Sequence, residues 1–285
     1  MSDLTTSPRR KVVNKVMMGL TWVAAVVATL PLLFILFYLL QKGLTSLNVA
    51  FFTHLPRPPG MEGGGMANAI VGTLIVVGGA SLLGVPIGIG AGIYLAEKKN
   101  APLATLVRFL ADVLNGLPSI VMGIFAWELV VVPMGHFSAA AGALALGAMM
   151  IPTVTRTTEE MVRVVPTTLR EAALALGYTR WRTSLRIVLP TALAGILTGV
   201  LVALARIAGE TAPLLFTAFG NNFWSFSFNQ PIAALPLQIF NYAIAPYDDW
   251  HAQAWAGALV LIGLVLIISL VARAATKSGF ARAVD

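Results

Sequence analysis

Two charged side chains lie within an apolar run of the chain. Arg206 and Glu210 belong to TALAGILTGVLVALARIAGETAPLLFTAF, residues 191–219. A charge near the centre of a bilayer is costly, roughly 3 kcal/mol for Arg on insertion scales. The four-residue spacing places the two side chains on one face of a helix. The pattern predicts either an ion pair that holds helices together or a charged constriction on the path of an anion.

The second interpretation gives each charge a role. Arg206 offsets the desolvation of a passing anion, and Glu210 prevents Arg206 from holding it too tightly, because transport needs release as well as entry. Gly209 and Pro213 flank Glu210 and weaken the helix at that depth. Asp112, in ADVLNGLPSIV, is a further candidate for the lining of the pathway.

The composition predicts a membrane protein made of helices. Of 285 residues, 58% are apolar and 11% are charged, and a spanning helix needs about 20 apolar residues. We expect an all-α, polytopic protein with one domain and six transmembrane helices. The runs are 16–40, 68–96, 106–132, 139–155, 191–219 and 252–272.

The basic residues predict the orientation. Of the 19 Lys and Arg, all but Lys42, Arg57 and Arg206 lie on one side of the six runs. Their positions fall within 9–15, 98–108, 156–186 and 273–282. Basic loops stay in the cytoplasm, so both termini are expected there. The net charge of +7 is therefore a sign of topology, and we expect no nucleic-acid partner.

Several kinds of chemistry are excluded. The chain has no Cys, and His54, His136 and His251 lack the spacing of metal ligands, so no metal site is expected. No GxxxxGK[ST] motif occurs, so the chain does not cradle nucleotide phosphates by that device, and no bound cofactor is expected. An intramembrane hydrolase would need a GxSG serine with His, paired aspartates or HExxH, none of which is present.

The segments around the spans carry weaker signals. Residues 1–15 are expected to form a mobile polar tail, and the connection 41–67, with PRPPGMEGGG, is expected to hold no helix. Residues 220–250 predict a short or re-entrant helix at the outer interface. Two Gly stripes are expected to let helices approach closely. They are Gly84, Gly88 and Gly92, and Gly195 and Gly199.

A polar, Arg-rich segment, EAALALGYTRWRTSLRIVLP, separates two apolar runs. Thr168 and Glu171 predict a capping box that begins a short helix. Gly177 predicts its end, and a second helix is expected to start near Thr179 and stop before Pro190.

This second helix is predicted to have two faces. Trp181, Leu185 and Val188 make an apolar face, whereas Arg182 and Arg186 make a basic one. Two short helices at an angle would form a rigid knob suited to mechanical coupling. The alternative is an ordinary amphipathic surface loop in which Glu171 merely caps its own helix.

The spacing of Glu171-Ala172-Ala173, Gly177 and Leu189-Pro190 resembles the cytoplasmic coupling loop of ABC importer permeases. The resemblance implies the type I ABC importer permease (MetI-like) fold, with a coupling loop at 159–190. It also implies that a separate ATPase subunit docks on this loop and hydrolyses the ATP.

Other segments narrow the resemblance. ARIAGETAPLLFTA, NNFW, QPIAALP, DDWHAQAWAGALVL and NGLPSIVMGIFAW are similar to the A-type permease subunits of phosphate (Pst) importers, and the similarity covers about residues 66–275. A permease domain at 16–275 is then expected, with its ABC transmembrane region at about 68–272 and a cytoplasmic tail at 276–285.

The resemblance implies partners and a location. These are a C-type permease subunit, two ATPase subunits, a periplasmic phosphate-binding protein, inorganic phosphate and the lipids of the bacterial inner membrane. Arg206 and Glu210 match the intramembrane charges that function in that family. A permease for sulfate, molybdate or another small anion is the main alternative. A passive anion channel would share the charged constriction but would not need the coupling loop.

Overall fold

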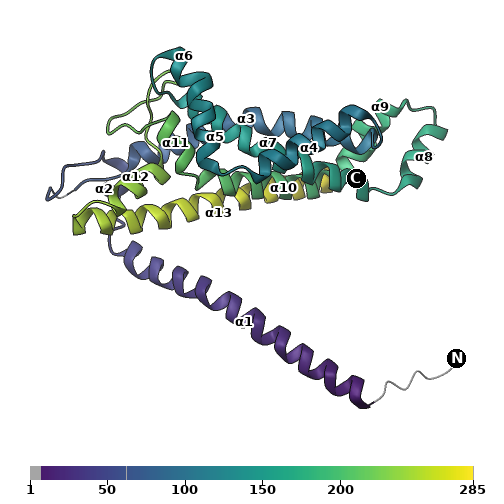
Figure 1. Cartoon of the computed structure of the whole chain (residues 1–285), viewed down its shortest axis with the longest axis horizontal. Coiled ribbons are helices and arrows are strands. Elements are labelled where there is room, and N and C mark those ends of the chain that lie inside the picture. Colours follow the sequence, from purple (N-terminus) through teal and green to yellow (C-terminus); the bar gives the residue numbers. More distant parts are fainter. Residues whose placement is uncertain (1–7, 62, 285) are drawn as a thin grey trace.

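The computed structural model describes residues 8–61 and 63–284, with the side chains of 9–61 and 63–274, and it is built of helices (Figure 1). The long helices are α1 (Pro8–Leu44), α3 (Ala67–Glu97), α4 (Pro102–Gly116), α7 (Ala139–Val164), α10 (Leu189–Ala208) and α13 (Asp248–Val284). Short helices join them. In the described residues, β structure is limited to an isolated bridge between Phe219 and Ile232, which agrees with the expected all-α class.

The short elements lie at the breaks and connections of the chain. They are α2 (Val49–Thr53), α5 (Ser119–Ala126), the π-helical η1 (Trp127–Val131), α6 (Val132–Met134), α8 (Thr167–Ala175), α9 (Arg180–Thr183), the π-helical η2 (Ser184–Val188), α11 (Ala212–Thr217) and α12 (Leu235–Ala243). Five helical stretches of the described chain are long and apolar enough to cross a membrane. A sixth span, as expected, is obtained when the bent pair 102–116 and 119–134 counts as one.

The third expected span, 106–132, is bent rather than straight. The helices on either side of the bend meet at 107°. Leu117 is extended, with φ −72° and ψ 136°, because the residue before a proline is disfavoured in the helical region. Pro118 then precedes a new helix, α5. The third span is therefore an interrupted helix.

Helix α7 is the centre of the packed body. The fourth apolar run, 139–155, had an uncertain end because of Pro152, and α7 continues to Val164 with Pro152 inside it. On one side, a Cβ at Gly88 of α3 would lie 2.7 Å from the Cβ of Val154. On the other side, Gly199 of α10 approaches Thr157. The Gly stripes therefore bring α3 and α10 against α7, which confirms the packing expectation.

Helix α1 stands apart from this body (Figure 1). The C-terminal part of α1 contacts α13, where Tyr38 and Trp255 pack edge to face with ring centroids 5.1 Å apart. Close approach also occurs at Gly43, where a Cβ would lie 2.9 Å from the carbonyl oxygen of Trp255. Only 6% of the membrane-spanning window of α1 is buried, so most of this helix is open to lipid or to another subunit.

Four segments differ from expectation or refine it. Residues 8–15 are the start of α1 rather than part of a polar tail, whereas residues 1–7 lie outside the described residues. The connection 41–67 holds α2, because the Asn48 side chain accepts a hydrogen bond from the Phe51 amide at 2.8 Å and caps the helix. The short helix expected within 220–250 is α12. The expected C-terminal tail, 276–285, is helical to Val284 as part of α13, and residue 285 lies outside the described chain.

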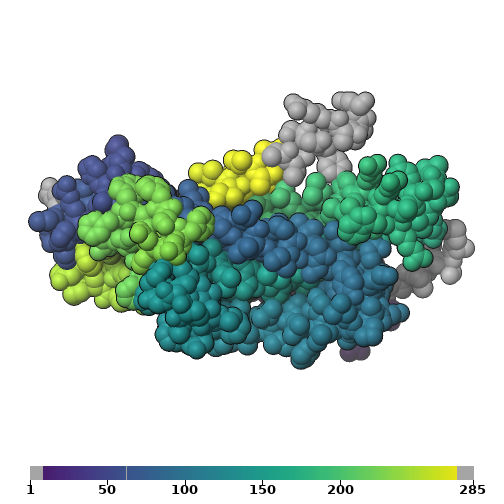
Figure 2. All heavy atoms as spheres, turned by 90° about the horizontal axis from the view of Figure 1, so that it is seen from above, coloured from purple at the N-terminus to yellow at the C-terminus, as the bar shows by residue number. Residues whose placement is uncertain are grey.

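The two ends of the long axis of the molecule differ in character (Figure 1). One end carries α8, α9 and the N-terminal end of α1, and the other carries α2, α6 and α12. Figure 2 shows the segment around α8 and α9 as a projecting lobe at one extreme of the molecule. The first end holds the basic connections at 98–108 and 156–186, so the structure groups the cations as the topology argument requires.

Candidate functional site

The fifth expected span ends earlier than its apolar run. Helix α10 stops at Ala208, and Gly209 caps it. The Gly209 amide donates to the Arg206 carbonyl at 3.3 Å, and the Glu210 amide donates to Ile207 at 3.2 Å. A new helix, α11, begins at Ala212. We call residues 209–211 the α10–α11 break.

This break corrects the geometry expected for the two intramembrane charges. Arg206 lies in the last turn of α10, whereas Glu210 lies outside the helix. They do not share a helix face as the spacing suggested, because Gly209 ends the helix between them. In the described residues the two form no ion pair. Of the two alternatives, the ion pair between Arg206 and Glu210 is therefore not formed within the described part of this chain.

The α10–α11 break packs against the other interrupted span. A Cβ at Gly123 of α5 would lie 2.7 Å from the Cα of Pro213 in α11. Two discontinuous helices thus meet inside the molecule. Non-helical backbone at membrane depth is tolerated where it is buried in protein or lines a water-filled cavity. Arg206 is exposed on the isolated chain and Glu210 is half-buried, so both charges remain accessible from outside this subunit.

Asp112, the third expected pathway residue, has a different environment. Arg156 of α7 donates to it through Nε at 2.9 Å, and a second guanidinium nitrogen also pairs with it. The carboxylate is 60% exposed. Asp112 therefore belongs to the contact between α4 and α7, and its partner is Arg156 rather than Arg206.

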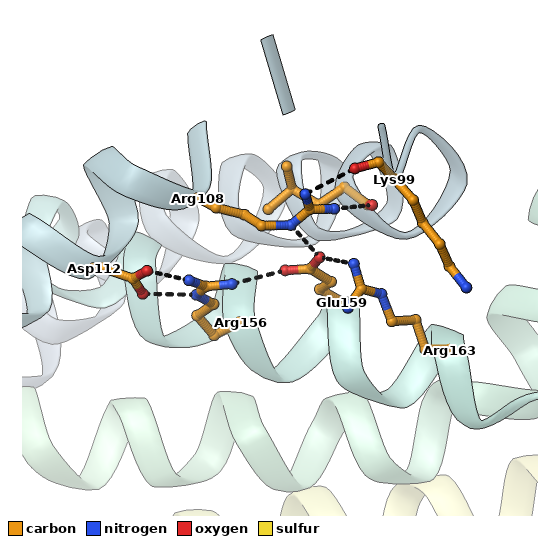
Figure 3. A network of polar contacts seen from close by, with 7 residues as sticks. Lys99, Arg108, Asp112, Arg156, Glu159 and Arg163 are labelled. Atoms are coloured by element: carbon orange, nitrogen blue, oxygen red, sulfur yellow. Dashed lines mark hydrogen bonds and ion pairs between the residues drawn. The ribbon is translucent and has the colours of Figure 1, made fainter. Parts of the chain in front are cut away.

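Arg156 connects Asp112 to a buried carboxylate that the sequence analysis missed. Glu159 of α7 is 1% exposed and is held by three arginines (Figure 3). Arg108 Nε donates to it at 2.7 Å and Arg156 donates at 3.2 Å, while Arg163 pairs with the same carboxylate. We call this group the ion cluster. It comprises Arg108, Asp112, Arg156, Glu159 and Arg163.

The ion cluster ties three helices together. Arg108 of α4 also donates to the Lys99 carbonyl at 3.0 Å and to the Leu95 carbonyl at 2.8 Å. The end of α3, the start of α4 and the last turns of α7 therefore share one network. A signal was present in the sequence, since Arg156, Glu159 and Arg163 recur at spacings of three and four on one helix face.

The segment that follows α7 forms the expected knob of two helices. We call residues 167–188, which comprise α8, α9 and η2, the coupling segment. Gly177 has φ +83°, which confirms the left-handed position after the first helix. The Thr179 side chain accepts from the Arg182 amide at 3.4 Å, which confirms the start of the second helix.

Two details of the coupling segment differ from expectation. Pro166 occupies the N-cap of α8 and no side chain caps it, so Thr168 and Glu171 form no capping box. The second helix does not stop before Pro190. It continues through η2 into α10, so that Arg180–Ala208 is a single span. Pro190 follows directly after the π-helical η2, where the regular α-helical bonding pattern is already interrupted.

The remaining expected coupling residues lie on the surface or just beneath it. Glu171, Ala172 and Gly177 are exposed, and Ala173 is buried. Further along, Leu189 is half-buried and Pro190 is exposed. The apolar face of the second helix is only partly covered, since Val188 is 1% exposed but Trp181 is 67% exposed.

Glu97, at the end of α3, anchors the coupling segment. It pairs with Arg170 of α8 and accepts a hydrogen bond from Ser184 Oγ of η2 at 2.9 Å. Arg170 also donates to the Val162 carbonyl of α7 at 3.0 Å. One carboxylate thus joins both halves of the coupling segment to the membrane helices. Its partners come from distant parts of the chain, so no local pattern in the sequence indicates its role.

Comparisons with known proteins identify the arrangement. Residues 84–278 match the family model described as binding-protein-dependent transport system inner membrane component. The chain is 45% identical to the phosphate transport system permease protein PstA of Yersinia pestis, over 93% of this chain and 90% of that one. It is 48% identical to PstA of Xylella fastidiosa strain Temecula1, over 93% of each chain. The chain belongs to the PstA permease family.

Solved structures agree with this placement at the level of the fold. The inward-facing MetNI methionine ABC transporter matches with a TM-score of 0.62 at 20% identity, over 75% of this chain and 96% of that one. A bacterial ABC transporter for the acidic polysaccharide alginate matches with a TM-score of 0.64 at 14% identity, over 94% and 98%. The type I importer permease fold is therefore confirmed. PstA permeases are transport components, so the chain is a membrane-spanning transport subunit rather than an enzyme.

Proposed function

We propose that this chain is one of two permease subunits of an ATP-driven importer of inorganic phosphate. A C-type permease subunit completes the membrane pathway, and two ATPase subunits and a periplasmic phosphate-binding protein complete the importer. The curated relatives are named for phosphate transport and cover nearly the whole chain, which supports phosphate over sulfate or molybdate. The importer lies in the bacterial inner membrane, with the coupling segment and both termini in the cytoplasm.

The observation that carries the proposed mechanism is the continuous helical span Arg180–Ala208. Its first turns belong to the exposed coupling segment, and its last turn carries Arg206. A helix interior is stiff because each turn is bonded to the next. A displacement imposed on the coupling segment therefore moves the Arg206 end of the same body.

The surface of the coupling segment suits a protein partner. Leu174 is 43% exposed and Leu176 is 79% exposed, although both side chains are large and apolar. Exposed apolar groups of this kind mark interaction sites. We assign this surface to an ATPase subunit. ATP is bound and hydrolysed by that subunit, and this chain itself binds no cofactor.

The pathway role falls to Arg206, with Glu210 as its moderator. Arg206 is exposed on the surface of this subunit and forms no ion pair with a described carboxylate. A cation in this state attracts an anion, and the nearby carboxylate limits how strongly the anion is held. A passive channel would need these charges but would have no use for a braced coupling segment.

Uptake by the reconstituted importer tests the proposal. Vesicles containing all the subunits and the binding protein should take up phosphate, and not sulfate or molybdate, when ATP is supplied. Arg206→Gln should abolish that uptake and leave assembly intact. Lys42→Gln, which removes a cation from the last turn of α1, is the matched control and should transport normally. Normal uptake by a well-assembled Arg206→Gln importer would remove Arg206 from the pathway.

A further inference from the structure

A pocket of about 400 Å³ lies between the end of α3 and the start of α9. We call it the α3–α9 pocket. Its volume is within the range of small-ligand sites. The residues that matter for its chemistry are Gly90, Ile93, Tyr94, Lys98, Arg180 and Trp181. From their arrangement we propose that the pocket binds an anionic phospholipid of the cytoplasmic leaflet, with the phosphate on Lys98 and Arg180 and an acyl chain toward Gly90.

The rim of the pocket has an excess of positive charge. Lys98 and Arg180 line it, and neither forms an ion pair with a described side chain. Glu97 also lines the pocket, but its charge is taken up by Arg170. Two cations therefore remain to bind an anion. Basic pockets between membrane helices on the cytoplasmic side are suited to phospholipid headgroups.

The floor of the pocket lies within the membrane-spanning part of α3. Gly90 is seven residues before the end of the helix at Glu97, which places it about 10 Å deeper at 1.5 Å per residue. Ile93 and Gly90 offer no polar side chain there. The apolar floor offers no favourable contact to a free phosphate. The surface of a soluble protein would not reach this depth of the membrane. A phospholipid fits both parts of the pocket, because its phosphate meets the basic rim and its acyl chain meets the apolar floor.

Aromatic side chains stand between the rim and the floor. Tyr94 and Trp181 both line the pocket, and such residues favour the headgroup level of a bilayer. The bound lipid would touch α3 and α9 at once. Because Ser184 of η2 is already bonded to Glu97 of α3, the lipid would reinforce a contact that braces the coupling segment.

The glycine in the floor offers a direct way to block the site. A Cβ at Gly90 would meet no atom within 4 Å, so Gly90→Leu places its side chain in open pocket space. Gly78 lies on the same helix and is also open, with nothing within 4 Å, but it does not line the pocket. Gly78→Leu is therefore the matched control.

Lipid retention by the purified full chain tests the proposal without depending on transport or on its substrate. Native mass spectrometry would compare phosphatidylglycerol with phosphatidylcholine. The wild type should retain phosphatidylglycerol selectively. Lys98→Gln combined with Arg180→Gln should weaken retention about thirty-fold, as expected for the loss of two cations at a membrane surface. Gly90→Leu should also release the lipid, and Gly78→Leu should keep it.

Other results would overturn the proposal. Equal retention of phosphatidylcholine would remove the role of charge, and full retention by Gly90→Leu would remove the role of the apolar floor. Displacement by inorganic phosphate or glycerol phosphate at equal concentration would make this a free-anion site. Loss of the lipid when ATPase subunits bind would make the pocket part of a protein interface. Matched unfolding temperatures of all variants exclude misfolding as the cause.

Discussion

The ion cluster and the α10–α11 break treat charge in opposite ways. In the ion cluster, the buried Glu159 is paired with three arginines, and Asp112 is paired with one of them. Near the break, Arg206 and Glu210 have no ion-pair partner in the described residues and remain accessible. The paired charges of this chain therefore hold its helices in position. Its unpaired charges are left for something outside the subunit.

The same contrast appears in the backbone. Around the ion cluster, α7 runs without interruption through Pro152, packed between α3 and α10. At the break the fifth span loses its helical structure, and α11 packs against α5 of the other interrupted span. The region that must keep its geometry is continuous. The region proposed to contact the anion contains backbone groups that helices do not satisfy.

The largest effect is expected from Glu159→Gln. Removing this charge leaves three arginines near a buried site, and breaking a buried pair costs about 3–5 kcal/mol. The unfolding temperature of the purified subunit measures the loss. Glu160→Gln is the matched control, because Glu160 is the next residue but is exposed, and it should change stability little. Equal stability of both variants would contradict the structural role of the ion cluster.

A smaller effect on stability but a clear effect on coupling is expected from Gly177→Val. The φ of +83° disfavours any side chain, and the left-handed conformation costs about 1–2 kcal/mol. Binding-protein-stimulated ATP hydrolysis by the assembled importer should fall by a factor of about 5–30 if that energy shifts the coupling segment away from its docked form.

Gly220→Val provides the comparison for this change. Gly220 has φ +90° and no neighbour within 4 Å, but it lies outside the coupling segment. The same strain there should leave stimulated hydrolysis near normal. If the two variants lose stimulation equally, the loss reflects general strain and the coupling segment has no special place.

The smallest effect on stability is expected from Glu210→Gln. Because Glu210 has no ion-pair partner in the described chain and is half-buried, its loss should change the free energy of unfolding by about 0.5 kcal/mol or less. Phosphate release should slow, because Arg206 then holds the anion unopposed. Transport should fall while labelled phosphate stays with the membrane domain. Unchanged uptake with unchanged stability would leave Glu210 without a role.

Much of this contrast was visible in the sequence, including the weakened helix between Gly209 and Pro213, but the geometry of the breaks was not. The apolar runs predicted where the chain crosses the membrane. Gly177 and Thr179 predicted the two short helices of the coupling segment. Pro118 and Pro152 lie in similar apolar runs, yet one bends its span by 107° and the other leaves α7 continuous. Pro152 lies in a helix that packs against α3 on one side and α10 on the other, and this tertiary context cannot be read from the local sequence.

The ion pairs also show that local sequence patterns cannot predict contacts between distant parts of the chain. Glu159 and its neighbours on α7 follow a local spacing, but Arg108 and Glu97 find partners 51 and 73 or more positions away. No pattern within one helix predicts such pairs. The extension of α9 into α10 was also missed, because Pro190 normally marks the end of a helix and the π-helical η2 is not encoded by a recognised motif.

The most direct measurement follows the helix Arg180–Ala208 in the working importer. The chain has no Cys, so spin labels on Arg182→Cys and Val202→Cys are unique. Twenty residues at 1.5 Å each give a Cα separation of about 30 Å. If the coupling segment and Arg206 belong to one rigid body, this distance should be the same with and without ATP in importers that transport phosphate. A change of more than about 5 Å, one helical turn, would show that the helix bends and would contradict the proposed mechanism.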